Sequence, residues 1–210
     1  MTPPKPVIGL VGGIGAGKSL AAAALARRGG AVVDADRIGH AVLNRPEVVA
    51  RLVGRWGPGV LRPDGTPDRR AIAAVVFADP AERAALEAAV FPGIGRLARE
   101  QIAAARADPA VRFVVLDAAV MMEAGWHGVC DKVIYVDAPR EVRLRRLAAR
   151  SGWTADDLTA REAAQMSPAG KMARADAVVV NDGTPDELAA RLDGLLAGWG
   201  IIPPGPPAAG

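Results

Sequence analysis

Residues 12–19 read GGIGAGKS and match the pattern G-x-x-x-x-G-K-[ST], with Gly12, Gly17, Lys18 and Ser19 at its fixed positions. Glycines let backbone N–H groups turn inward around an anion, and a helix that follows adds the positive end of its dipole. Lys18 is expected to reach the outer phosphates, and the Ser19 hydroxyl is expected to ligate Mg²⁺. The motif therefore predicts a site for a nucleoside triphosphate.

Short apolar strands alternate with helices around this loop. The residue pattern predicts strands at 5–11, 31–34, 111–118, 132–138 and 175–182. It predicts helices at about 18–28, 37–106, 140–174 and 185–199, the second interrupted by a turn-rich segment at 57–68 and the third by SPAG at 167–170. Because this alternation is typical of right-handed βαβ units, we expect an α/β fold of the P-loop NTPase type with a doubly wound, parallel, five-stranded sheet.

Two long helical segments interrupt the core where the second and fourth strands end. Ligands bind at the carboxyl ends of strands in an open α/β sheet, so these insertions are expected to flank the site. We predict a single unit over 1–200 with a flexible tail at 201–210. Its expected parts are a core (5–36, 107–139 and 175–200), a helical substrate-binding domain (about 37–106) and an Arg-rich helical lid (about 140–174).

The composition restricts the class of protein and its partners. The 210 residues include 26 Lys and Arg against 23 Asp and Glu, for a net charge of +3. No apolar run approaches the roughly 18 residues of a membrane span, and the single cysteine, Cys130, excludes an internal disulfide framework. Dispersed charge and few aromatic side chains argue against nucleic-acid binding. We expect a cytoplasmic protein, a monomer or a weak oligomer, with no signal peptide and with neither a membrane nor a nucleic-acid partner.

The third predicted strand indicates what becomes of the terminal phosphate. Motor ATPases usually end this strand in Asp-Glu, whereas here Asp117 is followed by Ala118 and Ala119. The N/T-K-x-D motif with which GTPases recognise guanine is also absent from the sequence. Both features favour transfer of the phosphoryl group to a bound acceptor, a reaction that depends on positioning and charge neutralisation.

An acceptor hydroxyl needs a carboxylate that orients it and accepts its proton. The sequence AVVDAD places Asp34 and Asp36 at the end of the second strand, beside the phosphate loop. We predict Asp36 as the base, although either carboxylate could instead cap the helix that follows. His40, one turn after Asp36, is expected to face the same cleft or to pack against the fold. Glu123, beyond the third strand, is a candidate for closing the acceptor pocket.

The helical stretch REVRLRRLAAR carries three arginines that fall on one face, at positions i, i+3 and i+7: Arg143, Arg146 and Arg150. Such a stripe is either a solvated face or a phosphate clamp that closes over the nucleotide and stabilises developing charge. Arg161 and Lys171, further along the chain, are candidates for the same lid.

The chain resembles the dephospho-CoA kinase family over about 7–195. The similar segments, in order, are GLVGGIGAGKS (9–19), DADRIGHAVL (34–43), DRRAIAAVVFADPAERAALEAAVFP (68–92), VLDAAVMMEAG (115–125), the Arg146/Arg150 pair, REAAQ (161–165) and ADAVVVNDG (175–183). The resemblance implies a P-loop kinase core, a helical substrate domain and a lid. It also implies transfer of the ATP γ-phosphoryl group, with Mg²⁺, to the 3′-hydroxyl of dephospho-CoA, giving CoA and ADP.

The resemblance further implies roles for individual residues. Asp36 falls on the family's catalytic carboxylate, Arg146 on its phosphate-contacting lid arginine, and Asn181 on the motif near the ATP base. The predicted catalytic residues are Asp36, Lys18 and Arg146. The predicted nucleotide contacts are Gly13, Ile14, Gly15, Ala16, Gly17, Lys18, Ser19, Leu20, Arg146, Arg150 and Asn181. The predicted substrate contacts are Asp36, His40, Asp117, Glu123 and Arg161, and the predicted metal ligand is Ser19.

Departures from the family pattern cluster on the acceptor side. Val11 and Leu20 stand where threonine is usual, Phe91 replaces the histidine of a His-Pro pair, and residues 119–122 differ from the family's D-x-P-L-L-F-E segment. The groups predicted to act on ATP are intact, so we expect an active enzyme. Two alternatives remain open: a P-loop kinase for another small hydroxyl acceptor, such as a nucleoside or nucleotide, and a non-enzymatic module in which ATP only orders the lid.

Overall fold

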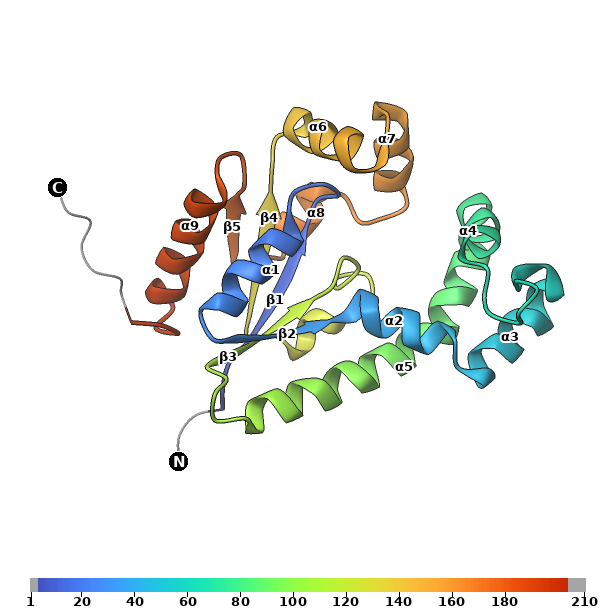
Figure 1. Cartoon of the computed structure of the whole chain (residues 1–210), viewed down its shortest axis with the longest axis horizontal. Coiled ribbons are helices and arrows are strands. Elements are labelled where there is room, and N and C mark those ends of the chain that lie inside the picture. The colour runs from blue at the N-terminus through green and yellow to red at the C-terminus, as the bar shows by residue number, and fades with distance from the viewer. Residues whose placement is uncertain (1–3, 204–210) are drawn as a thin grey trace. The chain divides into compact units, whose positions relative to one another are not determined.

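The structure, a computed structural model that describes residues 4–203, contains a five-stranded parallel sheet (Figure 1). Its strands are β1 (Val7–Gly12), β2 (Gly30–Asp34), β3 (Phe113–Asp117), β4 (Lys132–Asp137) and β5 (Ala177–Val180), in the spatial order β2-β3-β1-β4-β5. Parallel pairing joins β1 to β3 and β4, and β4 to β5. The predicted α/β class with a five-stranded parallel sheet is confirmed.

The described residues fall into two compact units. One combines residues 4–33 with 101–203, and the other is Asp34–Glu100. The second unit holds α2 (Ala35–Leu43), α3 (Pro46–Trp56), the short 3-10 helix η1 (Pro58–Val60), α4 (Arg69–Ala78) and most of α5 (Pro80–Ala107). Within it, Arg55 and Trp56 of α3 both donate to Glu82 of α5 and tie the two helices together. The substrate-binding role predicted for this helical region stays a prediction.

The central strands β1 and β3 are buried along their whole length, as expected where both faces of a parallel sheet are covered. Their register places Leu10 beside Asp117, and pairing with β4 places Gly12 beside Val136. The carboxyl ends of β1, β3 and β4 therefore meet at one edge of the sheet. The glycine-rich loop at 13–17 begins at this edge.

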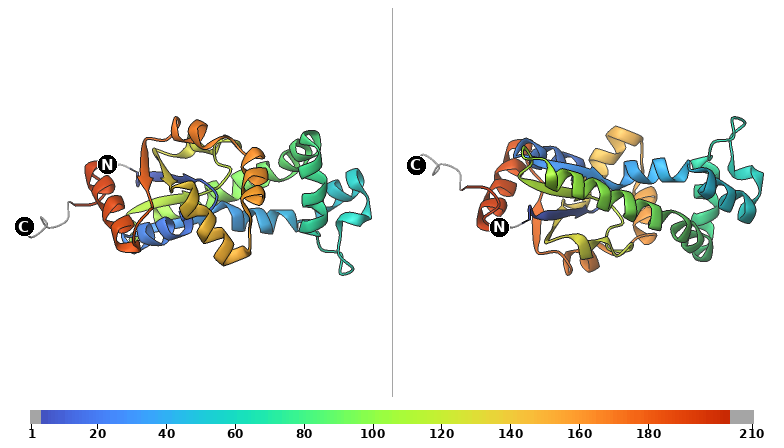
Figure 2. Two further views of the ribbon diagram at one scale, coloured as in Figure 1. Left: turned by 90° about the horizontal axis from the view of Figure 1, so that it is seen from above. Right: turned by 90° about the horizontal axis from the view of Figure 1, so that it is seen from below.

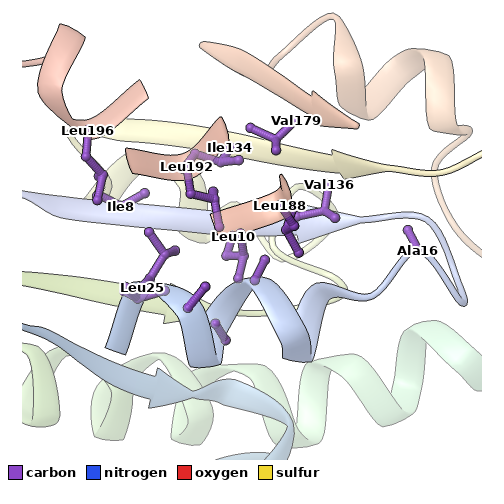
Figure 3. Packing of buried hydrophobic residues seen from close by; sticks show 14 of the residues in the cluster. Ile8, Leu10, Ala16, Leu25, Ile134, Val136, Val179, Leu188, Leu192 and Leu196 are labelled. Atoms are coloured by element: carbon purple, nitrogen blue, oxygen red, sulfur yellow. The ribbon is translucent and has the colours of Figure 1, made fainter. Parts of the chain in front are cut away.

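One face of the sheet is covered by α1 (Lys18–Arg27) and α9 (Pro185–Gly198) (Figure 2). Every fourth position of α9 carries a leucine that packs into the main apolar cluster with side chains of α1, β1 and β4 (Figure 3): Leu188, Leu192 and Leu196. A capping box fixes the start of α9, because Thr184 accepts from the Glu187 N–H and the Glu187 carboxylate accepts from the Thr184 N–H.

The chain turns back onto this cluster after α9. The Ile201 N–H donates to the Leu196 carbonyl at 2.9 Å, and Ile201 and Ile202 pack against the cluster while partly buried. The flexible tail was predicted to begin at 201, but these two residues pack on the core, because packing removes part of their apolar surface from water. The rest of the predicted tail, from 204 onward, lies outside the described residues.

Residues 140–174 form α6 (Arg140–Ser151), α7 (Ala155–Ala163) and α8 (Pro168–Met172), while η2 (Trp126–Val129) is a short 3-10 helix between β3 and β4. The helix break predicted at SPAG (167–170) lies slightly earlier in the structure, between the end of α7 at Ala163 and the start of α8 at Pro168. Ser167 caps α8 by accepting from the Gly170 N–H at 3.1 Å, and Pro168 is its first residue, where a missing N–H costs no helical hydrogen bond. None of the helices described within residues 4–203 combines the length and the apolar character that a membrane span requires.

The leucine stripe of α9 gives a stability prediction. Leu192→Ala should lower the free energy of unfolding by about 2–5 kcal/mol, because the buried side chain leaves a cavity in the main cluster. Val32→Ala, at an exposed position of β2, is the control and should cost about 1 kcal/mol or less. Urea unfolding followed by circular dichroism measures both, and equal losses would contradict the placement of Leu192 in the core.

Candidate functional site

The loop between β1 and α1 carries the glycine-rich motif. Gly15 and Gly17 have φ angles of 78° and 93°, in the left-handed region that favours glycine. Gly17 is also the N-cap residue of α1, and no side chain caps this end of the helix. The Leu20 N–H donates to the Gly17 carbonyl at 2.9 Å, so the N–H groups of Lys18 and Ser19, at the positive end of the helix dipole, are the ones available to an anion.

Asn181, which follows β5, lies directly against this loop. Its side-chain amide donates to the Ala16 carbonyl at 2.7 Å, and its backbone N–H donates to the Asp137 carbonyl at 2.7 Å. The residue is 1% exposed, and its Oδ1 is a buried acceptor to which the described residues donate no hydrogen bond. A Cβ on Gly17 would lie 2.1 Å from the Asn181 Nδ2, so only glycine fits there.

Lys18 forms an ion pair with Asp117, the last residue of β3. The two side chains are 17% and 11% exposed, so the pair is partly open to a ligand. The sequence predicted Lys18 as a phosphate contact and Asp117 as a substrate contact, but it did not predict their pairing. An anion that arrives at the loop competes with the Asp117 carboxylate for the same ammonium group.

The oxygen donors at this edge fit a magnesium ion. Ser19 is exposed in the first turn of α1, and the Asp117 carboxylate ends the neighbouring strand. Mg²⁺ prefers oxygen ligands and takes many of them from substrate phosphates and water.

The three arginines of α6 do not share one environment. Arg143 is 8% exposed and turns inward to pair with Glu162 of α7. Arg146 is half-buried, and its Nη1 donates to the Ala16 carbonyl at 3.3 Å. Arg150 is exposed in the last turn of the helix. Because the packing of α6 buries Arg143, the three arginines form neither one solvated face nor one clamp, and the nucleotide contacts predicted for Arg146 and Arg150 stay predictions. Glu162 lies in the REAAQ segment (161–165) but is not among the predicted site residues.

Lys171 also departs from the predicted lid. It is 2% exposed, and its ammonium group pairs with Glu123 at 3.0 Å and donates to the Ala119 carbonyl at 2.8 Å. It donates in addition to Gln165 Oε1 at 3.1 Å. Glu123 also accepts from the Met166 N–H at 2.9 Å. Lys171 and Glu123 thus fasten α8 to the segment that follows β3, so Lys171 has no room to close over a ligand.

Two predicted substrate contacts already have protein partners. Arg161 lies over the ring of Trp153, with 4.1 Å from the guanidinium carbon to the ring centroid, a cation–π contact. Glu123 holds Lys171 through Oε1, while its Oε2 is a buried acceptor that the described residues leave without a hydrogen bond. The roles predicted for Arg161 and Glu123 toward the acceptor stay predictions.

The Asp34–Glu100 unit holds the predicted acceptor base. Asp34 is the N-cap of α2 and accepts from the Arg37 N–H at 2.9 Å, which is the capping alternative left open for it. Asp36 lies exposed in the first turn of α2, and His40 lies exposed one turn later on the same helix. Of the two carboxylates, Asp36 is the one whose side chain is not used as the helix cap.

Two titratable groups close to the loop have shifted pKa values. Burial, with the charge of Asp137, raises the pKa of Tyr135, so its hydroxyl stays protonated at neutral pH. Burial also disfavours ionised Glu162, but hydrogen bonds and charges from Arg143 and Arg140 outweigh it and hold the pKa of Glu162 below its ordinary value. Glu162 is therefore a carboxylate at neutral pH.

The parallel sheet, the glycine loop after β1 and the lysine that ends the loop define a P-loop nucleotide-binding protein. The chain belongs to the dephospho-CoA kinase family, because the model of that family matches residues 6–187.

Individual relatives agree with this membership. A dephospho-CoA kinase of Anaeromyxobacter dehalogenans is 43% identical over 194 residues, which cover 91% of this chain and 90% of the relative. A dephospho-CoA kinase of Geobacter sulfurreducens is 39% identical, with 91% and 97% covered. The solved structure of TT1252 from Thermus thermophilus superposes with a TM-score of 0.78 at 37% identity, with 93% of this chain and 98% of that one covered.

The contact between Gly17 and Asn181 gives a binding prediction. Gly17→Ala should weaken ATP binding by at least about tenfold, because a side chain at a positive φ strains the loop and collides with Asn181. Gly54→Ala in α3 is the matched control, since nothing lies within 4 Å of its added Cβ. Isothermal titration with ATP compares the two. Unchanged affinity in a folded Gly17→Ala variant would contradict the described loop geometry.

The single cysteine gives a reactivity prediction. Burial, with the charge of Asp131, raises the pKa of the Cys130 thiol to about 12, and only the thiolate reacts. The folded protein should therefore react far more slowly at pH 8 than the same protein in guanidinium chloride when mixed with a chromogenic disulfide reagent. The fully unfolded sample calibrates one thiol per chain. Equal rates in the two states would contradict the burial of Cys130.

Proposed function

We propose that this chain transfers the γ-phosphoryl group of ATP to the 3′-hydroxyl of dephospho-CoA, giving CoA and ADP. The observation that carries the proposal is the complete phosphate loop with Lys18 at the carboxyl edge of the sheet, in a chain of the dephospho-CoA kinase family. Curated relatives that share about two fifths of their residues with it are named dephospho-CoA kinases.

On the nucleotide side, residues of the loop and of α6 would hold the triphosphate. Backbone N–H groups of the loop and of the start of α1 would donate to the phosphate oxygens, and Lys18 would exchange Asp117 for the β- and γ-phosphates. Arg146, already at the Ala16 carbonyl, would add a positive charge. Bound to the phosphates and to Ser19, Mg²⁺ would neutralise charge on the transferring group.

On the acceptor side, Asp36 would orient the 3′-hydroxyl and accept its proton. The hydroxyl oxygen forms a bond to the γ-phosphorus, the bond from that phosphorus to the β,γ-bridging oxygen breaks, and ADP leaves with the electron pair. Asp36 suits this role because it is exposed and follows the carboxyl end of β2 by two residues. We further propose, from its composition, that the protein acts in the cytoplasm without a nucleic-acid or membrane partner, as a monomer or a weak oligomer.

The neighbouring carboxylates Asp34 and Asp36 allow a matched test. Asp36→Asn should lower kcat by about 10²–10⁴-fold with little effect on ATP affinity, because the acceptor loses its base. Asp34→Asn is the control, since asparagine caps a helix as well as aspartate does. A single-turnover assay with Mg·ATP and dephospho-CoA, with products identified by mass and by ³¹P NMR, measures the chemical step.

The assay separates the possible outcomes. A 3′-phosphorylated product that disappears in Asp36→Asn and persists in Asp34→Asn supports the acceptor, the reaction and the base together. Unchanged turnover in Asp36→Asn removes that residue from the mechanism. ATP binding without CoA formation contradicts the proposed acceptor, and a panel of nucleosides and nucleotides then tests the other hydroxyl compounds.

A further inference from the structure

Arg143 occupies an unusual position for a cation in a phosphate-binding protein, because its guanidinium group is committed to the protein itself. Its Nε donates to the Ala138 carbonyl at 3.1 Å, and its Nη1 donates to the Ile14 carbonyl at 3.2 Å. Nη1 also forms the ion pair with Glu162. One buried side chain thus joins the end of β4, the phosphate loop and α7.

The bond to Ile14 constrains the phosphate loop through the geometry of the peptide unit. In a planar trans peptide, the carbonyl of one residue and the N–H of the next point in opposite directions. When Arg143 holds the Ile14 carbonyl toward α6, the Gly15 N–H must point to the opposite side. The same argument applies two residues later in the loop. Arg146 and Asn181 hold the Ala16 carbonyl and so orient the Gly17 N–H.

Alternate carbonyls of the loop are therefore held from outside, and the intervening N–H groups face the side on which an anion nest forms. Gly15 and Gly17 are also the two loop residues with positive φ. We propose that Arg143 is a positioning residue that fixes the phosphate loop in its ATP-binding shape, and that its ion pair with Glu162 makes this shape depend on the position of α7.

Arg143 is not itself placed to bind phosphate. It is 8% exposed, and its Nε and Nη1 are both engaged by protein oxygens. A planar guanidinium suits this task because its fixed fork reaches several acceptors at once, whereas a lysine would offer a single point charge. The carboxylate of Glu162 offsets the cost of burying the cation.

Arg140 provides a control on the same carboxylate. It donates to Glu162 Oε2 at 2.8 Å and to Thr159 Oγ1 at 2.7 Å, but its side chain is 45% exposed and its hydrogen bonds all go to α7. Arg140→Met therefore weakens the tie between α6 and α7 without touching the Ile14 carbonyl. A role of Arg143 that is only structural would make the two substitutions differ in stability alone.

The test measures nucleotide affinity first, so it rests on the proposed function only in requiring ATP at the phosphate loop. Arg143→Met should raise the Kd for ATP by about tenfold or more, the effect of one lost charge-assisted hydrogen bond, and Arg140→Met should stay within about twofold. Arg143→Lys and Glu162→Gln should each raise the Kd for ATP by a smaller factor. The double variant Arg143→Met/Glu162→Gln should bind ATP no more weakly than Arg143→Met does, because both changes act through the Ile14 carbonyl.

Two further measurements separate positioning from loss of fold. The KM for ATP should rise in the Arg143 variants while the KM for dephospho-CoA stays constant. Amide hydrogen exchange in a peptide spanning 13–20 should accelerate without ligand in Arg143→Met but not in Arg140→Met. If Arg143→Lys and Glu162→Gln fold, lose stability to urea and keep the ATP affinity of the unsubstituted protein, the inference is overturned. Failure of the unsubstituted chain to bind ATP would instead overturn the proposed function.

Discussion

The orientation of a few peptide units in the loop at 13–17 is the constraint on which the rest of the site depends. An anion nest needs N–H groups that face one side, and in each peptide unit this turns the carbonyl of the preceding residue toward the protein, where it needs a donor. Arg143 supplies the donor for Ile14, and Arg146 and Asn181 supply donors for Ala16. Because the loop follows the buried strand β1, it lies where α6 and the end of β5 can supply these donors.

Charge pairing explains why this edge of the sheet tolerates so many cations before an anion binds. Lys18 pairs with Asp117, Arg143 with Glu162 and Lys171 with Glu123. The Lys18 and Asp117 side chains are 17% and 11% exposed, and those of Arg143 and Glu162 are 10% and 19% exposed, so exposure does not separate these two pairs. Arg143 differs in its added hydrogen bonds to the Ala138 and Ile14 carbonyls, which commit it to the protein frame. Lys171 is almost fully buried, and removal of its partner would leave an uncompensated charge.

The sequence predicts the strands and the loop well, because both depend on local patterns: apolar runs for β1 and β3, and glycine spacing for the loop. It fails where the partner is distant along the chain. The spacing of the α6 arginines predicts that they lie on one face of the helix. It does not predict which of them becomes buried when the helix packs against the core. Lys171 meets Glu123, 48 positions earlier, and no periodicity signals that contact. The start of α8 could have been predicted from the sequence, since Ser167 followed by Pro168 is a helix-initiation signal.

The placement of α6 also limits what can move when a nucleotide binds. Arg143 and Arg146 hold loop carbonyls, and a Cβ on Gly15 would lie 2.9 Å from Leu147, so α6 cannot swing away without releasing the loop. Any closure of the predicted lid would therefore begin after α6, where Gly152 takes a φ of 67° before α7. Because Glu162 lies on α7, any such movement acts on Arg143 and hence on the Ile14 carbonyl. The proposed role of Arg143 would in this way join closure of the predicted lid to the shape of the phosphate loop through one ion pair.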